Sequence, residues 1–265
     1  MLIAQITDLH IRRSGDLAYS GEIDTAARLE SAVAFLNAFR PRPDVVLATG
    51  DLVDYGKPEE YRNLRRILDG LTQPLYLIPG NHDSRAGLRE AFADHAYLPR
   101  DGFLHYTVEH LPLRLIGLDT LDAGKPSGLM CAERIQWLDE RLSEQPRRPT
   151  LIFMHHPPFM TGIKEMDELW CFGGNRMGEV VARHAQVERV VCGHLHRATQ
   201  MRWYGPIALS TPATAPEVAL TLNGHGAHGW EAAPPQVGFH LWQGEAGLVS
   251  HVATVREGAV RPFRY

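Results

Sequence analysis

Short apolar runs alternate with amphipathic stretches through the first two thirds of the chain. The apolar runs predict buried strands at residues 2–7, 44–49, 74–79, 113–118, 150–154 and 189–192. Apolar residues at helical spacing predict amphipathic helices at residues 28–39, 59–71, 132–142 and 175–184. Pro58 supports the start of the second helix, because proline is tolerated in a first turn. Strands that alternate with helices in this way are typical of an α/β fold with a largely parallel sheet.

The pattern changes after residue 200. The remaining apolar runs are short and separated by Gly and Pro, which predicts antiparallel strands at residues 207–210, 218–222, 238–242 and 248–255. Residues 224–235 are rich in Gly, Ala and Pro, and we expect a mobile loop there.

Five polar clusters each follow one of the predicted strands directly. They are Asp8-Leu-His10, Gly50-Asp51, Gly80-Asn-His-Asp83, His155-His156 and Gly193-His-Leu-His196. Ligands of open α/β sheets bind beyond the carboxyl ends of the strands, so strands that share a sheet and a direction would bring the clusters together. The glycines fit sharp turns after strands, where a side chain would obstruct the close approach of the backbone.

The chemistry of these clusters is that of a metal site. Seven side chains offer carboxylate, imidazole or amide donors: Asp8, His10, Asp51, Asn81, His155, His194 and His196. This mixture of oxygen and nitrogen suits divalent Mn, Fe, Zn or Co. One ion takes four to six ligands, so seven donors predict two ions, with one carboxylate bridging them.

Composition excludes several other classes of protein. The 27 basic and 31 acidic residues give a formal net charge of −4, which argues against a basic nucleic-acid-binding surface. No run of apolar residues is long enough for a transmembrane helix, and the first residues do not resemble a signal peptide. Three widely spaced cysteines do not form a disulfide framework. We therefore expect a cytoplasmic protein that acts on a small molecule, with neither a nucleic acid nor a membrane as partner.

The ordered motif set resembles the calcineurin-like metallophosphoesterase superfamily over residues 1–212. Closer features resemble its bacterial branch of class III cyclic nucleotide phosphodiesterases and glycerophosphodiesterases. These features are Ile6-Thr-Asp-Leu-His10, Ala48-Thr-Gly-Asp-Leu-Val53, Lys57-Pro-Glu-Glu-Tyr61, Pro74-Leu-Tyr-Leu-Ile-Pro-Gly-Asn-His-Asp83, Phe153-Met-His-His-Pro-Pro158 and Cys192-Gly-His-Leu-His196.

The resemblance implies a four-layer αββα sandwich with a dinuclear metal site at the apex of its two sheets. Residues 1–212 would form the catalytic core. Residues 213–265 would form a β-rich segment that completes the sandwich and contributes to a homo-oligomer, either a dimer or a higher assembly.

The resemblance also implies a role for each site residue. Asp51 would bridge a first metal, held by Asp8, His10 and His196, and a second metal, held by Asn81, His155 and His194. His82 would act near the departing oxygen, oriented by Asp83. Asn81, His82 and His156 are the candidate substrate contacts, although His156 equally fits a hydrogen bond to a neighbouring carbonyl.

The implied activity is hydrolysis of a small phosphodiester by in-line attack of a metal-bound hydroxide. Glycerophosphodiesterases of this branch carry a substrate histidine in the segment that corresponds to residues 210–217, and this chain has none there. Cyclic nucleotides and glycerophosphodiesters therefore both stay open as substrates. The alternatives are a phosphomonoesterase, a nucleotide pyrophosphatase, a nuclease or a non-catalytic metal-bound scaffold. Whether residues 162–174 and 224–235 line the substrate pocket is also open.

Overall fold

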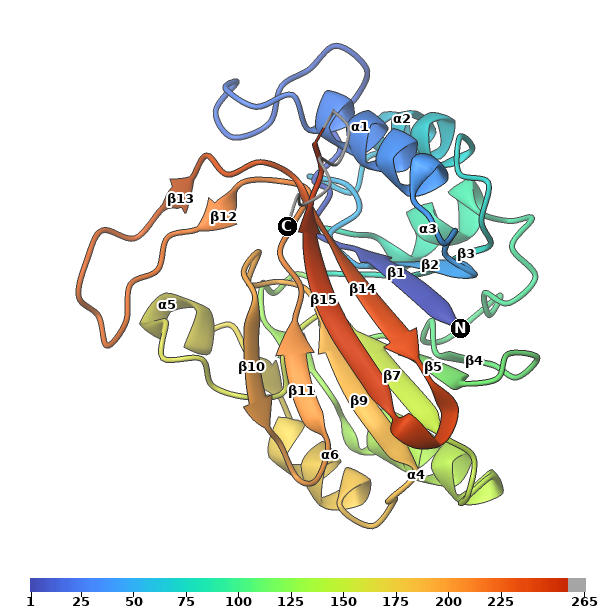
Figure 1. Ribbon diagram of the computed structural model, residues 1–265. Coiled ribbons are helices and arrows are strands. Elements are labelled where there is room, and N and C mark those ends of the chain that lie inside the picture. Colours follow the sequence, from blue (N-terminus) through green and yellow to red (C-terminus); the bar gives the residue numbers. More distant parts are fainter. Residues whose placement is uncertain (257–265) are drawn as a thin grey trace, which may run out of the picture.

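The computed structural model describes residues 1–256, and its strands form two main sheets that pack face to face (Figure 1). The first sheet has the strand order β15-β14-β1-β2-β3. These strands are β1 (Leu2–Ile6), β2 (Val45–Thr49), β3 (Leu75–Ile78), β14 (Gln236–Trp242) and β15 (Leu248–Thr254). β1, β2 and β3 are parallel, whereas β14 pairs antiparallel with β1 and with β15. Three neighbouring carboxyl ends therefore lie at one edge of this sheet.

The second sheet has the strand order β10-β11-β9-β7-β5-β4. Its strands are β4 (Tyr106–Val108), β5 (Arg114–Leu118), β7 (Thr150–Met154), β9 (Val187–Cys192), β10 (Thr199–Arg202) and β11 (Ile207–Ser210). The four central strands are parallel, and the edge strands β4 and β10 are antiparallel to their neighbours. β11 was expected among antiparallel strands, but it pairs parallel with β9 because the chain crosses over through β10 before it enters the sheet.

Helices cover the outer face of each sheet, which confirms the four-layer αββα arrangement (Figure 1). The helices of the first sheet are α1 (Thr25–Ala38), α2 (Pro58–Leu68) and α3 (Arg85–Ala91), and those of the second are α4 (Ala132–Glu144) and α6 (Gly174–Val181). No helix within the described part of the chain is both long enough and apolar enough to cross a membrane.

Strand β7 shows how alternation builds the layers. Its residues Leu151 and Phe153 belong to the core shared with the first sheet, whereas Ile152 and Met154 pack with α4 and α6. Successive strand residues point to opposite faces, so a strand covered on both faces is apolar throughout. All five residues of β7 are buried, as the continuous apolar run predicts.

The last third of the chain contributes two separate features. β14 and β15 extend the first sheet; of the segment 213–265, residues 257–265 lie outside the described part. Residues 217–231 form a projecting arm whose two short strands, β12 (Glu217–Val218) and β13 (Trp230–Glu231), pair with each other. The strand expected at residues 218–222 is thus confined to β12, and the expected loop 224–235 contains β13. The arm lies on the same side of the molecule as α5 (Lys164–Asp167) (Figure 1).

The remaining short elements carry little sequence signal. A two-residue parallel pair joins β6 (Gly128–Leu129) to β8 (Cys171–Phe172), and η1 (Gly244–Ala246) is a single 3-10 turn. The division of the chain at residue 212 stays a prediction, because β14 and β15 share a sheet with β1.

Candidate metal centre

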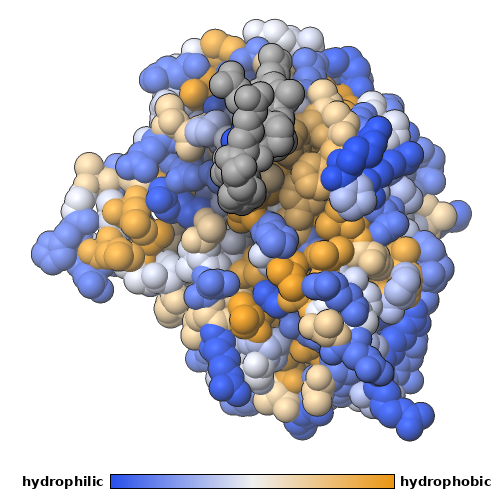
Figure 2. All heavy atoms as spheres, viewed as in Figure 1, coloured by the Kyte–Doolittle hydropathy of each residue, from blue (hydrophilic) through white to orange (hydrophobic). Residues whose placement is uncertain are grey.

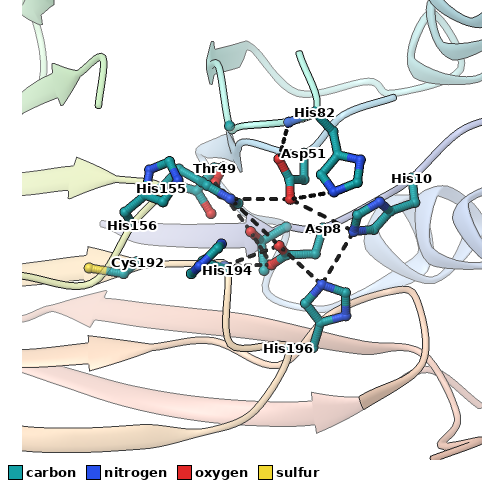
Figure 3. Close-up of polar contacts among 12 residues, drawn as sticks. Asp8, His10, Thr49, Asp51, His82, His155, His156, Cys192, His194 and His196 are labelled. Atoms are coloured by element: carbon teal, nitrogen blue, oxygen red, sulfur yellow. Dashed lines mark hydrogen bonds and ion pairs between the residues drawn. The ribbon is translucent and has the colours of Figure 1, made fainter. Parts of the chain in front are cut away.

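All seven predicted ligands lie in the first residues beyond the strands that precede them, and Figure 3 shows six of them, all except Asn81, converging where the two sheets meet. The first sheet supplies Asp8 and His10 after β1, Asp51 after β2 and Asn81 after β3. The second sheet supplies His155 after β7 and His194 and His196 after β9. Convergence at the carboxyl ends of parallel strands is the placement that the sequence pattern predicts.

The backbone at these positions is strained. Five of the seven residues have a positive φ: Asp8 at 53°, His10 at 45°, Asp51 at 48°, His194 at 69° and His196 at 53°. The left-handed region costs a non-glycine residue about 1 kcal/mol or more, and such residues cluster at functional sites. The chain therefore turns sharply after β1, β2 and β9, where these five side chains are placed.

Asp51 lies between the other groups of the site. Its Oδ2 is 3.3 Å from Nε2 of His155, 3.8 Å from Nε2 of His10 and 3.9 Å from Nε2 of His82. Asp8, His10 and His196 form one cluster of metal-binding atoms, and Asp8, Asp51 and His155 form another. A carboxylate in this position can reach two ions at once.

The first cluster presents unprotonated nitrogens to one another. Nδ1 of His196 donates to the carbonyl of Pro216 at 2.7 Å, and Nδ1 of His10 faces the Asp54 carboxylate at 3.4 Å. With the ring proton on each Nδ1, both Nε2 atoms carry a lone pair; they lie 3.2 Å apart, a distance at which one would otherwise donate to the other. Oδ1 of Asp8 is 3.4 Å from Nε2 of His196. Two lone pairs beside a carboxylate are complementary to a cation.

The second cluster is the other predicted ligand set, Asn81, His155 and His194, in which three buried donor atoms make no hydrogen bond to any described residue. Oδ1 of Asn81, Nε2 of His155 and Nε2 of His194 are buried and make no hydrogen bond within the described part of the chain. Nδ1 of His155 donates to the carbonyl of Thr49 at 2.8 Å, so its Nε2 is the free nitrogen. An unsatisfied buried polar atom costs about 1–3 kcal/mol, and three in one place require a ligand. These atoms fit a second ion.

Burial keeps several ligands in the state that binds a metal. It lowers the pKa of His194 to about 3 and that of His196 to about 4, so both imidazoles are neutral near pH 7. Burial also raises the pKa of Asp8 to about 6. At His155 burial lowers the pKa, but the neighbouring Asp51 carboxylate outweighs it and the pKa rises to about 9. A cation between Asp51 and His155 would replace that proton.

Gly80 leaves room for Asp51, because a Cβ at this position would overlap the Asp51 carboxylate and backbone nitrogen. We expect Gly80→Ala to destabilise the fold by about 2 kcal/mol and to weaken metal binding, since Asp51 must move. Gly229→Ala is the matched control, because a Cβ there meets no atom. Denaturant melts and metal titrations of both variants measure the difference. Equal behaviour of the two variants would contradict the close packing at Asp51.

His82 lies beside the clusters with one ring nitrogen free. Its Nδ1 donates to the carbonyl of Asp54 at 2.7 Å, which leaves Nε2 facing Asp51. The resemblance assigned this orienting contact to Asp83. The Asp83 carboxylate instead accepts hydrogen bonds from the backbone of Leu52 at 3.1 Å and of Gly80 at 2.8 Å. Asp83 is buried, and its hydrogen bonds stabilise the turns that carry Asp51 and Asn81, because Leu52 and Gly80 are the neighbours of these two residues.

His156 is fully buried, and both of its ring nitrogens have protein partners. Its Nδ1 lies 2.8 Å from Oγ1 of Thr120, and its Nε2 lies 3.3 Å from the carbonyl of Pro126. A substrate contact through His156 stays a prediction. The contact with the Pro126 carbonyl matches the alternative interpretation of His156, a hydrogen bond to a neighbouring carbonyl.

Asp54 is the site residue that the motifs did not indicate. Its side chain contacts His10, and its Oδ2 accepts from Arg12 at 3.0 Å. Its backbone carbonyl holds His82. The sequence feature that could have indicated Asp54 is its position, since it is a second carboxylate three residues after Asp51. Asp54 thus contacts both the ring of His10, a predicted metal ligand, and the ring of His82, the candidate acid.

A cavity of about 380 Å³ opens onto the site. Five of the predicted ligands, His10, Asp51, Asn81, His194 and His196, line it together with His82. Met166 and Leu169 also line it, so part of the segment 162–174 faces the cavity, whereas no residue of 224–235 is among its lining residues.

The sequence profile of the calcineurin-like phosphoesterases matches residues 1–198. The chain belongs to this family. It is 34% identical over 256 residues to a probable glycerophosphodiester phosphodiesterase of Arcobacter nitrofigilis, covering 96% of this chain and 93% of the relative. It is 35% identical over 240 residues to a probable cyclic nucleotide phosphodiesterase of Rhodopseudomonas palustris, covering 89% and 86%. A dimetal phosphatase of Danio rerio shares the fold, with a TM-score of 0.67, 16% identity and coverage of 97% and 99%.

Metal binding should stabilise this family member measurably, because it satisfies the buried donors that otherwise lack partners. At a concentration 100 times the dissociation constant, each ion adds about 2.7 kcal/mol to the free energy of unfolding. We expect the melting temperature of metal-free protein to rise by about 5 °C or more with excess Mn²⁺ or Zn²⁺. Differential scanning calorimetry with and without chelator measures this shift. Mg²⁺ is the control ion, since it prefers oxygen ligands, and an equal shift with Mg²⁺ would contradict a histidine-rich site.

Proposed function

We propose that this chain is a dinuclear metal-dependent hydrolase of small phosphodiesters. The observation that carries the proposal is the set of three buried, unpartnered donor atoms on Asn81, His155 and His194, beside the carboxylate of Asp51. The family membership and the phosphodiesterase relatives support the same activity. A non-catalytic scaffold would not need His82 to present a free nitrogen to the cavity.

The predicted ligands divide into two sets, one for each ion. Asp8, His10 and His196 would hold the first ion and Asn81, His155 and His194 the second, and Asp51 would be shared between them. When bound, two divalent ions neutralise the charge of the phosphodiester and lower the pKa of water toward neutrality. The mixed nitrogen and oxygen donors suit Mn, Fe, Zn or Co, and the supply of metal in the cell decides among them.

The protein itself supplies orientation and a proton. The carbonyls of Thr49 and Pro216 fix the tautomers of His155 and His196, so that the correct nitrogen faces each ion. The carbonyl of Asp54 fixes the ring of His82, whose Nε2 is placed to protonate the departing oxygen. Asn81 and His82 are the candidate substrate contacts on this side of the cavity.

Relatives named for glycerophosphodiesters and for cyclic nucleotides both align along most of the chain. Residues 210–217 contain no histidine, so a substrate contact of that kind is missing here. We propose that both classes of small diester are candidate substrates, and that phosphomonoesters are poorer ones.

Turnover of bis(p-nitrophenyl) phosphate against p-nitrophenyl phosphate tests the proposal. Protein loaded with Mn²⁺ should hydrolyse the diester with the higher kcat/KM. Preference for the monoester would instead assign the chain as a phosphomonoesterase. Hydrolysis of cyclic AMP and of glycerophosphoethanolamine, followed by phosphorus NMR, then separates the two substrate classes.

The cytoplasmic location and the homo-oligomer expected from the sequence stay predictions. Light scattering coupled to size-exclusion chromatography gives the mass of the assembly, and cell fractionation gives the location.

A further inference from the structure

One wall of the cavity differs in chemistry from the rest. Most of the lining consists of histidines, carboxylates and other polar groups. This wall instead consists of Met166 and Leu169, from the segment 160–170, and of Val218, from the arm. Met166 is buried, and Leu169 and Val218 are half-buried. These three residues form what we call the apolar wall.

The apolar wall is fixed to the metal-binding loop. Met166, Ile163 and Leu195 form a small hydrophobic cluster, against which Val218 packs. Leu195 lies between the ligands His194 and His196, so the wall is anchored within the same loop as two ligands. His82, by contrast, is held by the Asp54 carbonyl from another loop.

The arm joins the segment 160–170 and stabilises the wall from outside. Leu222 forms a backbone bridge with Ile163, and the backbone nitrogen of Asn223 donates to the carbonyl of Gly162 at 3.0 Å. At the other side of the arm, the Trp230 ring packs edge-on against Tyr19, with centroids 5.4 Å apart, and Tyr19 lines the cavity. The arm therefore spans two loops that border the same cavity. Figure 2 shows hydrophobic surface on this projecting part of the molecule.

The cavity offers no lysine or arginine to a second negative group. Among the described residues that line it, none is Lys or Arg. The arginines of the surrounding loops are already bound. Arg12 pairs with Asp54 at 3.0 Å, Arg85 with Asp119 at 2.5 Å and Arg197 with Glu217 at 2.9 Å, and Arg28 donates to the carbonyl of Thr214 at 2.6 Å.

We propose that Met166 and Leu169 are specificity-determining residues, which select diesters whose remaining ester group is uncharged and has an apolar face. This inference rests on the proposed phosphodiesterase function and assigns the part of the substrate that the metal ligands do not contact. The group that stays on phosphorus packs against the apolar wall, while the departing oxygen faces His82. A further negative charge on that group would lie against two hydrophobic side chains, with no lysine or arginine among the lining residues to pair it and with Asp51 and Asp54 also lining the cavity.

A matched pair of diesters tests the proposal. Phenyl p-nitrophenyl phosphate and 4-carboxyphenyl p-nitrophenyl phosphate share the leaving group and differ by one remote carboxylate. For the wild-type protein we expect kcat/KM to be about tenfold higher for the uncharged diester. In Leu169→Lys the new ammonium group should pair with the carboxylate and reduce that preference about tenfold, to near equality.

Leu220→Lys is the control, since it adds the same charge on the arm at a residue that is 54% exposed and does not line the cavity. It should leave the preference unchanged. Met166→Ala gives a second test: inhibition by diphenyl phosphate should weaken, while inhibition by dimethyl phosphate, which is too small to cover the wall, should not.

The outcomes separate the specificity proposal from the function itself. A wild-type protein that hydrolyses both diesters equally well would overturn the proposal and leave the phosphodiesterase function standing. The proposal would also be overturned if Leu169→Lys and Leu220→Lys had the same preference between the two diesters. It would be overturned as well if Met166→Ala weakened inhibition by diphenyl phosphate and by dimethyl phosphate equally. A protein that hydrolyses neither diester in the presence of metal would overturn both.

Discussion

Asp51→Asn should reduce kcat/KM for bis(p-nitrophenyl) phosphate by about 1,000-fold. Asp51 faces predicted ligands of both clusters, with Oδ2 at 3.3 Å from His155 and 3.8 Å from His10. An amide in its place removes the negative charge and offers a single weak donor, so two cations would lie together without the anion that separates them. Steady-state kinetics and metal analysis by mass spectrometry measure the loss of activity and of bound metal.

The Asn side chain can still accept the hydrogen bond that Oδ1 of Asp51 receives from the backbone of His82 at 2.9 Å, so the loss should not arise from unfolding. Asp44→Asn is the matched control. Its carboxylate also accepts a backbone hydrogen bond, from Leu2 at 2.7 Å, at the start of β1 and away from the site. Activity of Asp44→Asn should stay within about twofold of wild type. Near-normal activity in Asp51→Asn would refute the bridging role.

His82→Ala should lower kcat by about 100-fold, with little change in KM. His82 is fixed through Nδ1 and presents Nε2 to the cavity, as a proton donor to the departing oxygen requires. An interaction made only in the transition state appears in kcat, because the ground state does not depend on it.

The leaving group distinguishes this role from a structural one. An alkoxide needs a proton to depart, whereas p-nitrophenolate departs readily without one. The loss in His82→Ala should therefore be large for a dialkyl diester and small for a p-nitrophenyl diester. The same loss for both leaving groups would show that His82 only shapes the site. His95→Ala provides a control histidine that does not line the cavity.

The convergence of the ligands could be predicted from the sequence because it depends on two local signals. Each apolar run marks a strand, and each polar cluster marks the carboxyl end of that strand. Residues such as Asp8 and His155 are separated by most of the chain, yet they belong to strands whose alternating side chains form one core between the sheets. The site therefore forms only when the two sheets pack together. The sequence predicts this packing because its apolar runs form the hydrophobic core between the sheets.

The partners that orient the ligands could not be predicted in the same way. His155 and His196 are oriented by the backbone carbonyls of Thr49 and Pro216, and any residue type provides a carbonyl. The orienting role expected of Asp83 falls to the carbonyl of Asp54 for the same reason. The apolar wall also carried no signal, because Met166 lies in the four-residue helix α5 and Leu169 just after it, and one helical turn is too short to show a periodic pattern.

The most direct test of the account follows diester hydrolysis while metal-free protein is titrated with Mn²⁺. The account predicts no turnover of bis(p-nitrophenyl) phosphate without metal, and activity that rises until about two ions are bound per chain. Turnover that persists in excess chelator, or that reaches its maximum with a single bound ion, would contradict a dinuclear centre formed by the two clusters that share Asp51.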